Sequence, residues 1–390
     1  MTYDALTIDT QVVYSNNLEL DAGLVGQLNQ FEGGLVQFLL SEINLREIHK
    51  ALTDKAKSPH DALSKAIKSG LSNGQLEEAQ QSALSGVLET MVKPLDHAKK
   101  QLEDFLYATG GEIVAADQAD MKAILDKYFK NEPPFASKGK KNEFPDAIAL
   151  LSLENWAIQN QKRILAVSND GDWKTFADQS EHIDVVDDLG KALTLLNELA
   201  EETVPLAKEV LGLIHADDTD LVRRLRSSLE TEVESEFPYL EFDGPMPGED
   251  EGTNMSLVDF EIHGLADGNT EIDIVRVGTQ GFAFRVPTHI VANVYAEISF
   301  SIRDSIDKDY VPMGSTSVER EIEFEAFLLF EISHFLNDDE DEKPVKYEIE
   351  NLELLGAPSS VDIGYIEYSL ADDDYEFEFE NMNEEPVGDG

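Results

Sequence analysis

Residues 164–173, ILAVSNDGDW, join four apolar residues to a polar turn that carries two carboxylates. A short, continuous apolar run is typical of a strand that is buried on both faces, as in a parallel sheet. Three other runs have the same character, namely ALTI at 5–8, LVQFLL at 35–40 and IDVV at 183–186. Together the four runs predict a parallel sheet in the first half of the chain.

Segments with the apolar spacing of helices separate these runs, at 44–52, 60–106 and 146–160. Strands that alternate with helices indicate an α/β fold. The segment 60–106 is too long for a simple crossover between two strands. We therefore expect an α/β domain with a helical insertion.

The pattern changes in the second half of the chain. Residues 202–236 have the spacing of two helices, and 244–252, GPMPGEDEG, have the composition of a linker. Beyond them, apolar and polar residues alternate with a period of two, most clearly at 288–302 and 318–332. Long alternating strands separated by turns predict an all-β, antiparallel, sandwich-like domain.

The net charge divides in the same way as these patterns. Of the total of −49, residues 1–200 carry −12 and residues 201–390 carry −37. Such an asymmetry suggests modules with different tasks, and it restricts any nucleic-acid contact to a local region. We expect, in order, an α/β domain, a helical connector, a linker, an acidic β-rich domain and an acidic tail, at 1–200, 201–243, 244–252, 253–370 and 371–390.

Several classes of protein are excluded by composition. The chain of 390 residues has no cysteine, which rules out disulfides, thiolate zinc sites and cysteine nucleophiles. No apolar run approaches the ~20 residues that a membrane helix needs. The first ten residues, MTYDALTIDT, lack the features of a signal peptide. We expect a soluble, cytoplasmic protein without a membrane partner.

Carboxylates follow the predicted strands where a ligand site is expected. Open parallel sheets bind ligands outside the carboxyl ends of their strands. The acids at these ends or at the starts of the next helices are Asp9, Glu42, Glu47, Asp146, Asp170 and Asp172. Like charges so close together cannot all stay ionised unless a cation neutralises them or their pKa values rise. Oxygen ligands in a small cluster suit Mg²⁺ or Mn²⁺, which we therefore expect as the cofactor.

Two of these acids compete for one place in the site. Glu42 and Glu47 are five residues apart, so at ~100° per residue they point in different directions. Ser41 stands where an N-cap belongs, which puts Glu42 in the first helical turn, where the helix dipole favours an acid. Glu47 lies a turn deeper, next to Ile48, and we expect it partly buried on the side that faces the sheet. The site acid is therefore expected to be Glu47.

The same residues carry a family resemblance. Four stretches are similar to the successive motifs of PIN-domain nucleases: Ile8-Asp9-Thr10, residues 40–48 (LSEINLREI), Pro145-Asp146-Ala147 and residues 168–173 (SNDGDW). The stretch 128–173, with PPF at 133–135 and EFPDA at 143–147, resembles a bacterial branch of that family. The resemblance covers roughly residues 1–195. Gln11 stands where many members have Asn and Trp173 where many have Phe, and neither departure removes a carboxylate.

The resemblance implies metal-dependent hydrolysis of phosphodiesters, usually of RNA. It implies that the metal-binding catalytic acids are Asp9, Glu47, Asp146 and Asp170, with Asp172 as a fifth ligand. A metal ion held by carboxylates activates water, so no side-chain nucleophile is required. We also expect contacts with the substrate from Ser168 and from three lysines that precede the EFPDA motif, Lys138, Lys140 and Lys141.

Other interpretations stay open. An aspartate at a strand end or helix start is often only a turn former or an N-cap. The chain as a whole is alternatively a non-catalytic acidic binding protein that mimics nucleic acid or docks a basic protein partner, with the α/β half as a scaffold. Metal binding separates this alternative from a nuclease, since a binding protein has no need of it. A third possibility is that the acidity reflects a salt-adapted host.

Overall fold

A parallel five-stranded sheet organises the N-terminal half of the computed structural model, which describes residues 3–73, 76–135, 143–216, 219–278, 281–303, 310–335 and 346–367. The strands are β1 (Ala5–Ile8), β2 (Gln37–Ser41), β3 (Glu112–Val114), β4 (Ile164–Val167) and β5 (Ile183–Val186). Their order is β3-β2-β1-β4-β5, and all neighbours are parallel. The predicted α/β fold is confirmed.

Helices cover both faces of this sheet. Leu6 and Ile8 belong to one buried core, whereas Ala5 belongs to the other, so alternate residues of β1 face opposite layers. This burial on both faces explains the continuous apolar runs. The helices are α1 (Thr10–Ser15), α2 (Gly23–Gly26), α3 (Glu42–Ser72), α4 (Glu78–Thr90), α5 (Pro94–Thr109), α6 (Met121–Lys130), α7 (Phe144–Asn160), α8 (Gly171–Ala177) and α9 (Leu189–Leu196), with 3₁₀ turns η1 (Gln27–Phe31) and η2 (Ala116–Gln118).

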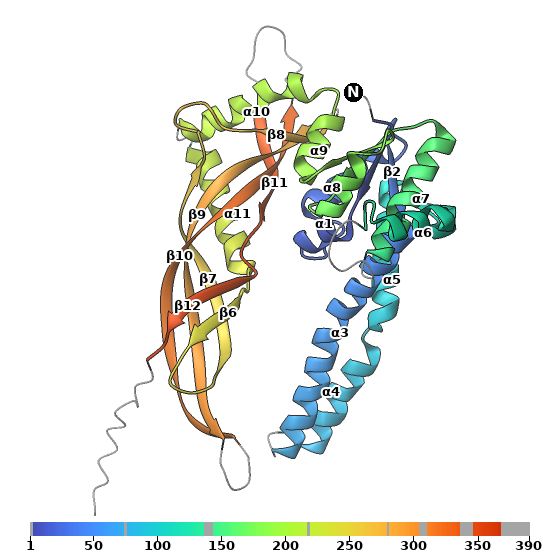
Figure 1. Cartoon of the computed structure of the whole chain (residues 1–390). Coiled ribbons are helices and arrows are strands. Elements are labelled where there is room, and N and C mark those ends of the chain that lie inside the picture. The colour runs from blue at the N-terminus through green and yellow to red at the C-terminus, as the bar shows by residue number, and fades with distance from the viewer. Residues whose placement is uncertain are drawn as a thin grey trace, which may run out of the picture. The chain divides into compact units, whose positions relative to one another are not determined.

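The helical insertion is formed by α3, α4 and α5. Helix α3 alone has 31 residues, and both α4 and α5 pack against it (Figure 1). Helix α3 thus contains the predicted helical segment 44–52 together with the first part of the predicted insertion 60–106. No described helix is both long and apolar enough to cross a membrane.

Two helices and a set of long strands make up the second half of the described chain. The elements are α10 (Ala200–His215), α11 (Thr219–Ser235), β6 (Tyr239–Asp243), β7 (Gly248–Ile262), β8 (Asp273–Val277), β9 (Gly281–Arg303), β10 (Tyr310–Phe335), β11 (Lys346–Leu355) and β12 (Ser360–Tyr365). One sheet has the order β11-β10-β9-β7, with β8 also paired to β9, and β6 pairs with β12 in a second, parallel sheet. The pairs β10–β11 and β8–β9 are antiparallel, as predicted.

The predicted linker is only partly outside regular structure. Strand β7 begins at Gly248, inside 244–252, and β6 lies inside the predicted helical connector 201–243. At Gly248 a Cβ atom would lie 3.0 Å from both Ile298 and Phe242, tighter than ordinary contact. This glycine thus allows close packing within the β-rich part. The composition of 244–252 predicted a linker, although part of this segment is a strand.

The described chain divides into two compact units that do not follow the sequence order. The first comprises residues 1–229, 261–289 and 325–357, and the second comprises 230–260, 290–324 and 358–390. Strands β9 and β10 therefore contribute to both units. The functional domain limits drawn along the sequence stay a prediction, and the predicted acidic tail lies outside the described residues.

A buried arginine joins distant segments within the first unit. The side chain of Arg285, on β9, is 3% exposed and forms ion pairs with Asp188, the N-cap of α9, and with Asp273 on β8. Its guanidinium carbon also lies 4.4 Å from the ring centre of Phe327. A buried cation needs such partners, because an uncompensated buried charge is strongly destabilising. The guanidinium group packs directly on the backbone of Gly190.

Substitution of Gly190 by alanine tests this contact. The new Cβ atom would overlap the Arg285 guanidinium group, so the ion pairs must break or α9 must shift. We expect Gly190→Ala to lower the free energy of unfolding by about 2–4 kcal/mol. The matched control is Gly212→Ala in α10, where a Cβ meets no atom within 4 Å, and which should be neutral or stabilise by up to ~1 kcal/mol. Equal effects in urea unfolding would show that the contact is unimportant.

Candidate functional site

Asp9 lies at the carboxyl end of the central strand β1 and occupies the N-cap position of α1. It is 6% exposed. The Ser168 hydroxyl, at the end of β4, donates to Asp9 Oδ2 over 2.8 Å, and Asn44 Nδ2 donates to Asp9 Oδ1 over 3.3 Å. The parallel register of β1 and β4 pairs Ile8 with Val167, which places Asp9 and Ser168 next to each other. The carboxylate is therefore fixed from two sides.

Hydrogen bonds extend from Asp9 to two further predicted acids. Asn44 Nδ2 also donates to Thr10 Oγ1 over 3.2 Å, and the Thr10 hydroxyl donates to Glu47 Oε2 over 2.8 Å. On the other side, the backbone N–H of Asp170 donates to Ser168 Oγ over 3.0 Å. The carboxylates of Asp9 and Glu47 and the backbone of Asp170 are thus connected through neutral side chains.

Asp146 approaches the same place from the first turn of α7. The indole N–H of Trp173, a fully buried side chain on α8, donates to Asp146 Oδ1 over 3.1 Å. Asp170 caps α8 by accepting a hydrogen bond from the N–H of Asp172 over 2.6 Å. The charges of Glu47 and Asp170 raise the pKa values of both Asp9 and Asp146, and we call these four residues the acidic cluster.

Burial and the charges of neighbouring carboxylates raise the pKa values of two members of the acidic cluster, Asp9 and Asp146. Burial is the main cause of the raised pKa of Asp9, and the charges of Asp170 and Glu47 raise it further. The pKa of Asp146 rises to about 6, again mainly through burial. The neighbouring carboxylates add to this rise, whereas the hydrogen bond from Trp173 opposes it. A carboxyl group with a raised pKa is stabilised when it binds a proton or a nearby cation.

A fifth carboxylate, Glu143, was missed by the sequence analysis. It occupies the N-cap position of α7, and its pKa is raised to about 7 by burial and by a hydrogen bond with Asp172. The charges of Asp146 and Asp170 contribute to the same shift. The sequence signal for Glu143 was its position three residues before Asp146. Acids are common at the starts of helices in general, so this position did not distinguish Glu143.

The structure separates Glu42 from Glu47 as expected. The Glu42 carboxylate accepts the backbone N–H of Ala116 over 2.9 Å and pairs with Arg46, and both contacts lower its pKa. Ser41 Oγ accepts the N–H of Asn44, as an N-cap does. Glu47 contacts Thr10 instead, although its side chain is exposed rather than partly buried as expected. The catalytic role of Glu47 stays a prediction.

The predicted substrate contacts have a different outcome. Lys138, Lys140 and Lys141 lie outside the described residues. Ser168 is 0% exposed, and its hydroxyl bonds Asp9 and the Asp170 backbone. The substrate-binding role of Ser168 stays a prediction, and the role that its hydrogen bonds support is the positioning of Asp9.

The described residues contain no group of three or more Asp, Glu or His side chains arranged to hold a metal ion. The donor set of the acidic cluster nevertheless consists of carboxylate oxygens, which suit Mg²⁺ and Mn²⁺ chemically. Two of the four carboxyl groups have raised pKa values, so a cation would relieve a cost that the fold already carries.

The raised pKa values predict how stability depends on pH in the absence of divalent ions. A carboxyl group with a raised pKa binds its proton more tightly in the folded than in the unfolded state. Its contribution to stability is therefore lost as the pH rises through the folded pKa. Because the pKa of Asp146 rises from 3.8 to about 6, this loss takes place between these two values, and we expect Asp146→Asn in EDTA to match the parent only near pH 3. At pH 8 the variant should exceed the parent by on the order of 1–2 kcal/mol in urea unfolding.

Glu42→Gln is the control, because the pKa of Glu42 is lowered and its removal should cost more stability at pH 8 than at pH 4. A difference between Asp146→Asn and the parent that is independent of pH would contradict repulsion in the acidic cluster.

Comparison with known proteins agrees with the geometry of this domain. Residues 6–173 match the family model of the PIN domain. Searches of curated proteins and of solved structures gave no match. The matched segment runs from β1 to α8 and includes all four residues of the acidic cluster. PIN domains are typically nucleases that use divalent metal ions. The α/β domain of this chain, over residues 6–173, is therefore a PIN domain.

Proposed function

We propose that the PIN domain of this chain is a metal-dependent endonuclease that hydrolyses phosphodiester bonds in RNA. The observation that carries the proposal is the acidic cluster, in which buried Asp9 and half-buried Asp146 have raised pKa values beside Asp170 and Glu47. Such perturbed carboxyl groups are typical of functional sites. The EFPDA motif supports assignment to the bacterial branch of the family, and we propose a cytoplasmic site of action.

The acidic cluster would hold Mg²⁺ or Mn²⁺, with Asp172 as an additional ligand. When bound, the ion supplies an activated water and neutralises charge on the phosphate oxygens. The residues around it keep the carboxylates in place: Ser168 and Asn44 orient Asp9, and Trp173 orients Asp146. These donors are neutral, so they fix the oxygens without replacing the cation.

The first test is cleavage of labelled single-stranded RNA and DNA by the full chain with Mg²⁺, Mn²⁺ or EDTA. We expect RNA cleavage with either ion and none in EDTA. Asp146→Asn should reduce the rate by at least ~100-fold while the protein stays folded, because the hydrogen bond from Trp173 can still form. Asp126→Asn, on the exposed side of α6, makes the same change and should leave the rate unaltered.

A parent protein that cuts no RNA with either ion would contradict the nuclease. If it still bound RNA without metal, the alternative of a non-catalytic binding protein would be favoured.

A matched pair on one helix tests the site acid on α3. Glu47→Gln removes a charge from the acidic cluster, and we expect at least a ~10-fold loss of the cleavage rate together with weaker Mn²⁺ binding. Glu42→Gln is the same change five residues earlier, at a side chain bound to Ala116 and Arg46, and should keep the parental rate. Mn²⁺ binding is measured by titration calorimetry. The reverse ranking of the two variants would exclude Glu47 as a ligand.

A further inference from the structure

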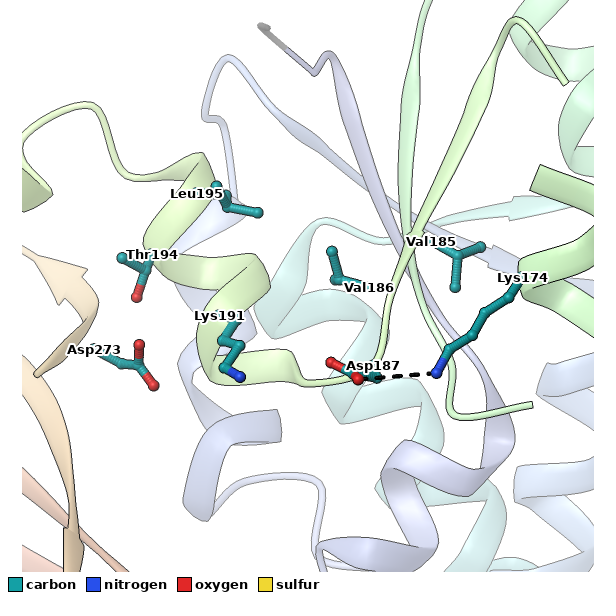
Figure 2. A pocket seen from close by; sticks show the side chains of 8 residues that line it. All are labelled: Lys174, Val185, Val186, Asp187, Lys191, Thr194, Leu195 and Asp273. Atoms are coloured by element: carbon teal, nitrogen blue, oxygen red, sulfur yellow. Dashed lines mark ion pairs between the residues drawn. The ribbon is translucent and has the colours of Figure 1, made fainter. Parts of the chain in front are cut away.

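A second polar feature lies beside the acidic cluster, at the carboxyl end of the edge strand β5. It is a cavity of about 460 Å³, open on one side, within the first unit. Lys174 from α8 and Lys191 from α9 approach Asp187 from opposite sides, with Val186 between the two helices (Figure 2). The volume falls in the range of ordinary small-ligand sites. We call it the β5 pocket.

The cations of the β5 pocket are available to a ligand. Lys191 is exposed and has no ion-pair partner among the described residues. Lys174 has only a long pair, with 3.8 Å between its Nζ and Asp187, and both side chains are well exposed. Asp273, also at the pocket, is already engaged by Arg285. Both ammonium groups can therefore pair with an anionic ligand.

An apolar wall completes the pocket. Val186 on β5 faces the layer of α9, where Leu195 exposes 61% of its surface, whereas Val185 lines the pocket from the opposite face of the strand. The wall and the two ammonium groups lie within one cavity, an arrangement that suits a ligand with an apolar face and a negative charge. A nucleotide has both, since its base and sugar offer apolar surface and its phosphate is an anion.

The β5 pocket is connected to the acidic cluster through two short segments. The N–H of Lys174 donates to the carbonyl of Asp170 over 3.3 Å, one turn along α8. The N–H of Ser168 donates to the carbonyl of Val186 over 3.0 Å. A helical turn rises ~5.4 Å, so the backbone of Lys174 lies one turn from that of Asp170 in the acidic cluster.

We propose that the β5 pocket binds the RNA strand next to the bond that is cut, with Lys174 and Lys191 on its phosphates and the apolar wall against one nucleoside. This inference rests on the proposed function, because it takes the acidic cluster as the place of cleavage. Phosphate binding replaces the long pair between Lys174 and Asp187. Asp187 then lies near a phosphate, so removal of its charge should tighten binding.

Binding of a fluorescein-labelled, 12-nucleotide single-stranded RNA to the full chain tests the β5 pocket. Anisotropy is measured in EDTA, without turnover, between 50 and 300 mM KCl. At 50 mM KCl, Lys174→Gln and Lys191→Gln should each raise Kd about fivefold, and Asp187→Asn should lower it. Each lost phosphate contact should reduce the slope of log Kd against log salt by about 0.7.

The control Lys65→Gln makes the same charge change at an exposed position of α3 and should leave both the Kd and the slope at the parental values. Absence of RNA binding by the parent, or equal effects of all three lysine variants, would overturn the β5 pocket.

Cleavage assays on the same proteins separate the two proposals. With Mn²⁺, the Lys174→Gln and Lys191→Gln variants should raise KM and keep kcat, because the lysines bind RNA away from the reacting atoms. If the parent fails to cleave RNA but the two variants weaken binding, the proposed function is wrong and the pocket stands. If the parent cleaves RNA and no variant changes KM or Kd, the pocket is wrong and the nuclease stands.

Discussion

Repulsion between carboxylates at one edge of the parallel sheet is the constraint on which the rest of this site depends. The fold brings Asp9 from β1, Glu47 from α3, Asp146 from α7 and Asp170 from α8 together, and burial adds to the cost of keeping them ionised. The surrounding neutral donors make sense in this light. The carboxylate oxygens are held by neutral donors, which supply no positive charge: Ser168, Asn44, Thr10 and Trp173. A divalent cation would supply the positive charge that these donors do not, as the proposed chemistry requires.

Much of the fold was predictable because local pattern and tertiary structure agree in the N-terminal half. Runs such as ILAV at 164–167 are apolar on both faces and bounded by polar turns, and they coincide with strands. Strand β3 was not predicted because it has only three residues, lies at the edge of the sheet and has two exposed residues. Strand β7 was not predicted because its first residues are rich in glycine and acid. They pair with the long strand β9, and such pairing overrides the local preference for a turn or linker. The division of β9 and β10 between two units depends on distant contacts that no local pattern records.

For the site, the order of elements along the sequence was enough to predict the acids but not the residues that hydrogen-bond to them. Asp9 and Asp170 follow directly after strands, so topology alone brings them near each other. The choice of Glu47 over Glu42 followed from helical geometry. Asn44 and Glu143 carried no such signal, since an asparagine in a first helical turn and a glutamate at a helix start are common for reasons of capping. The burial of Ser168 could not be predicted from the local sequence, because it depends on β5, which is distant in sequence.

The first unit draws its interior from both ends of the chain. Val275, Ala283 and Leu329 belong to the same buried core as Leu193, beneath the PIN domain's sheet. On the ribosome, the segment that ends at Leu193 emerges well before Leu329 has been made. At translation rates of ~5–20 residues per second, this interval is on the order of 10 s. During that time the nascent domain presents an unfilled apolar surface, and it becomes a finished globule only when the late strands arrive. Synthesis of the second half is thus a step in the maturation of the first.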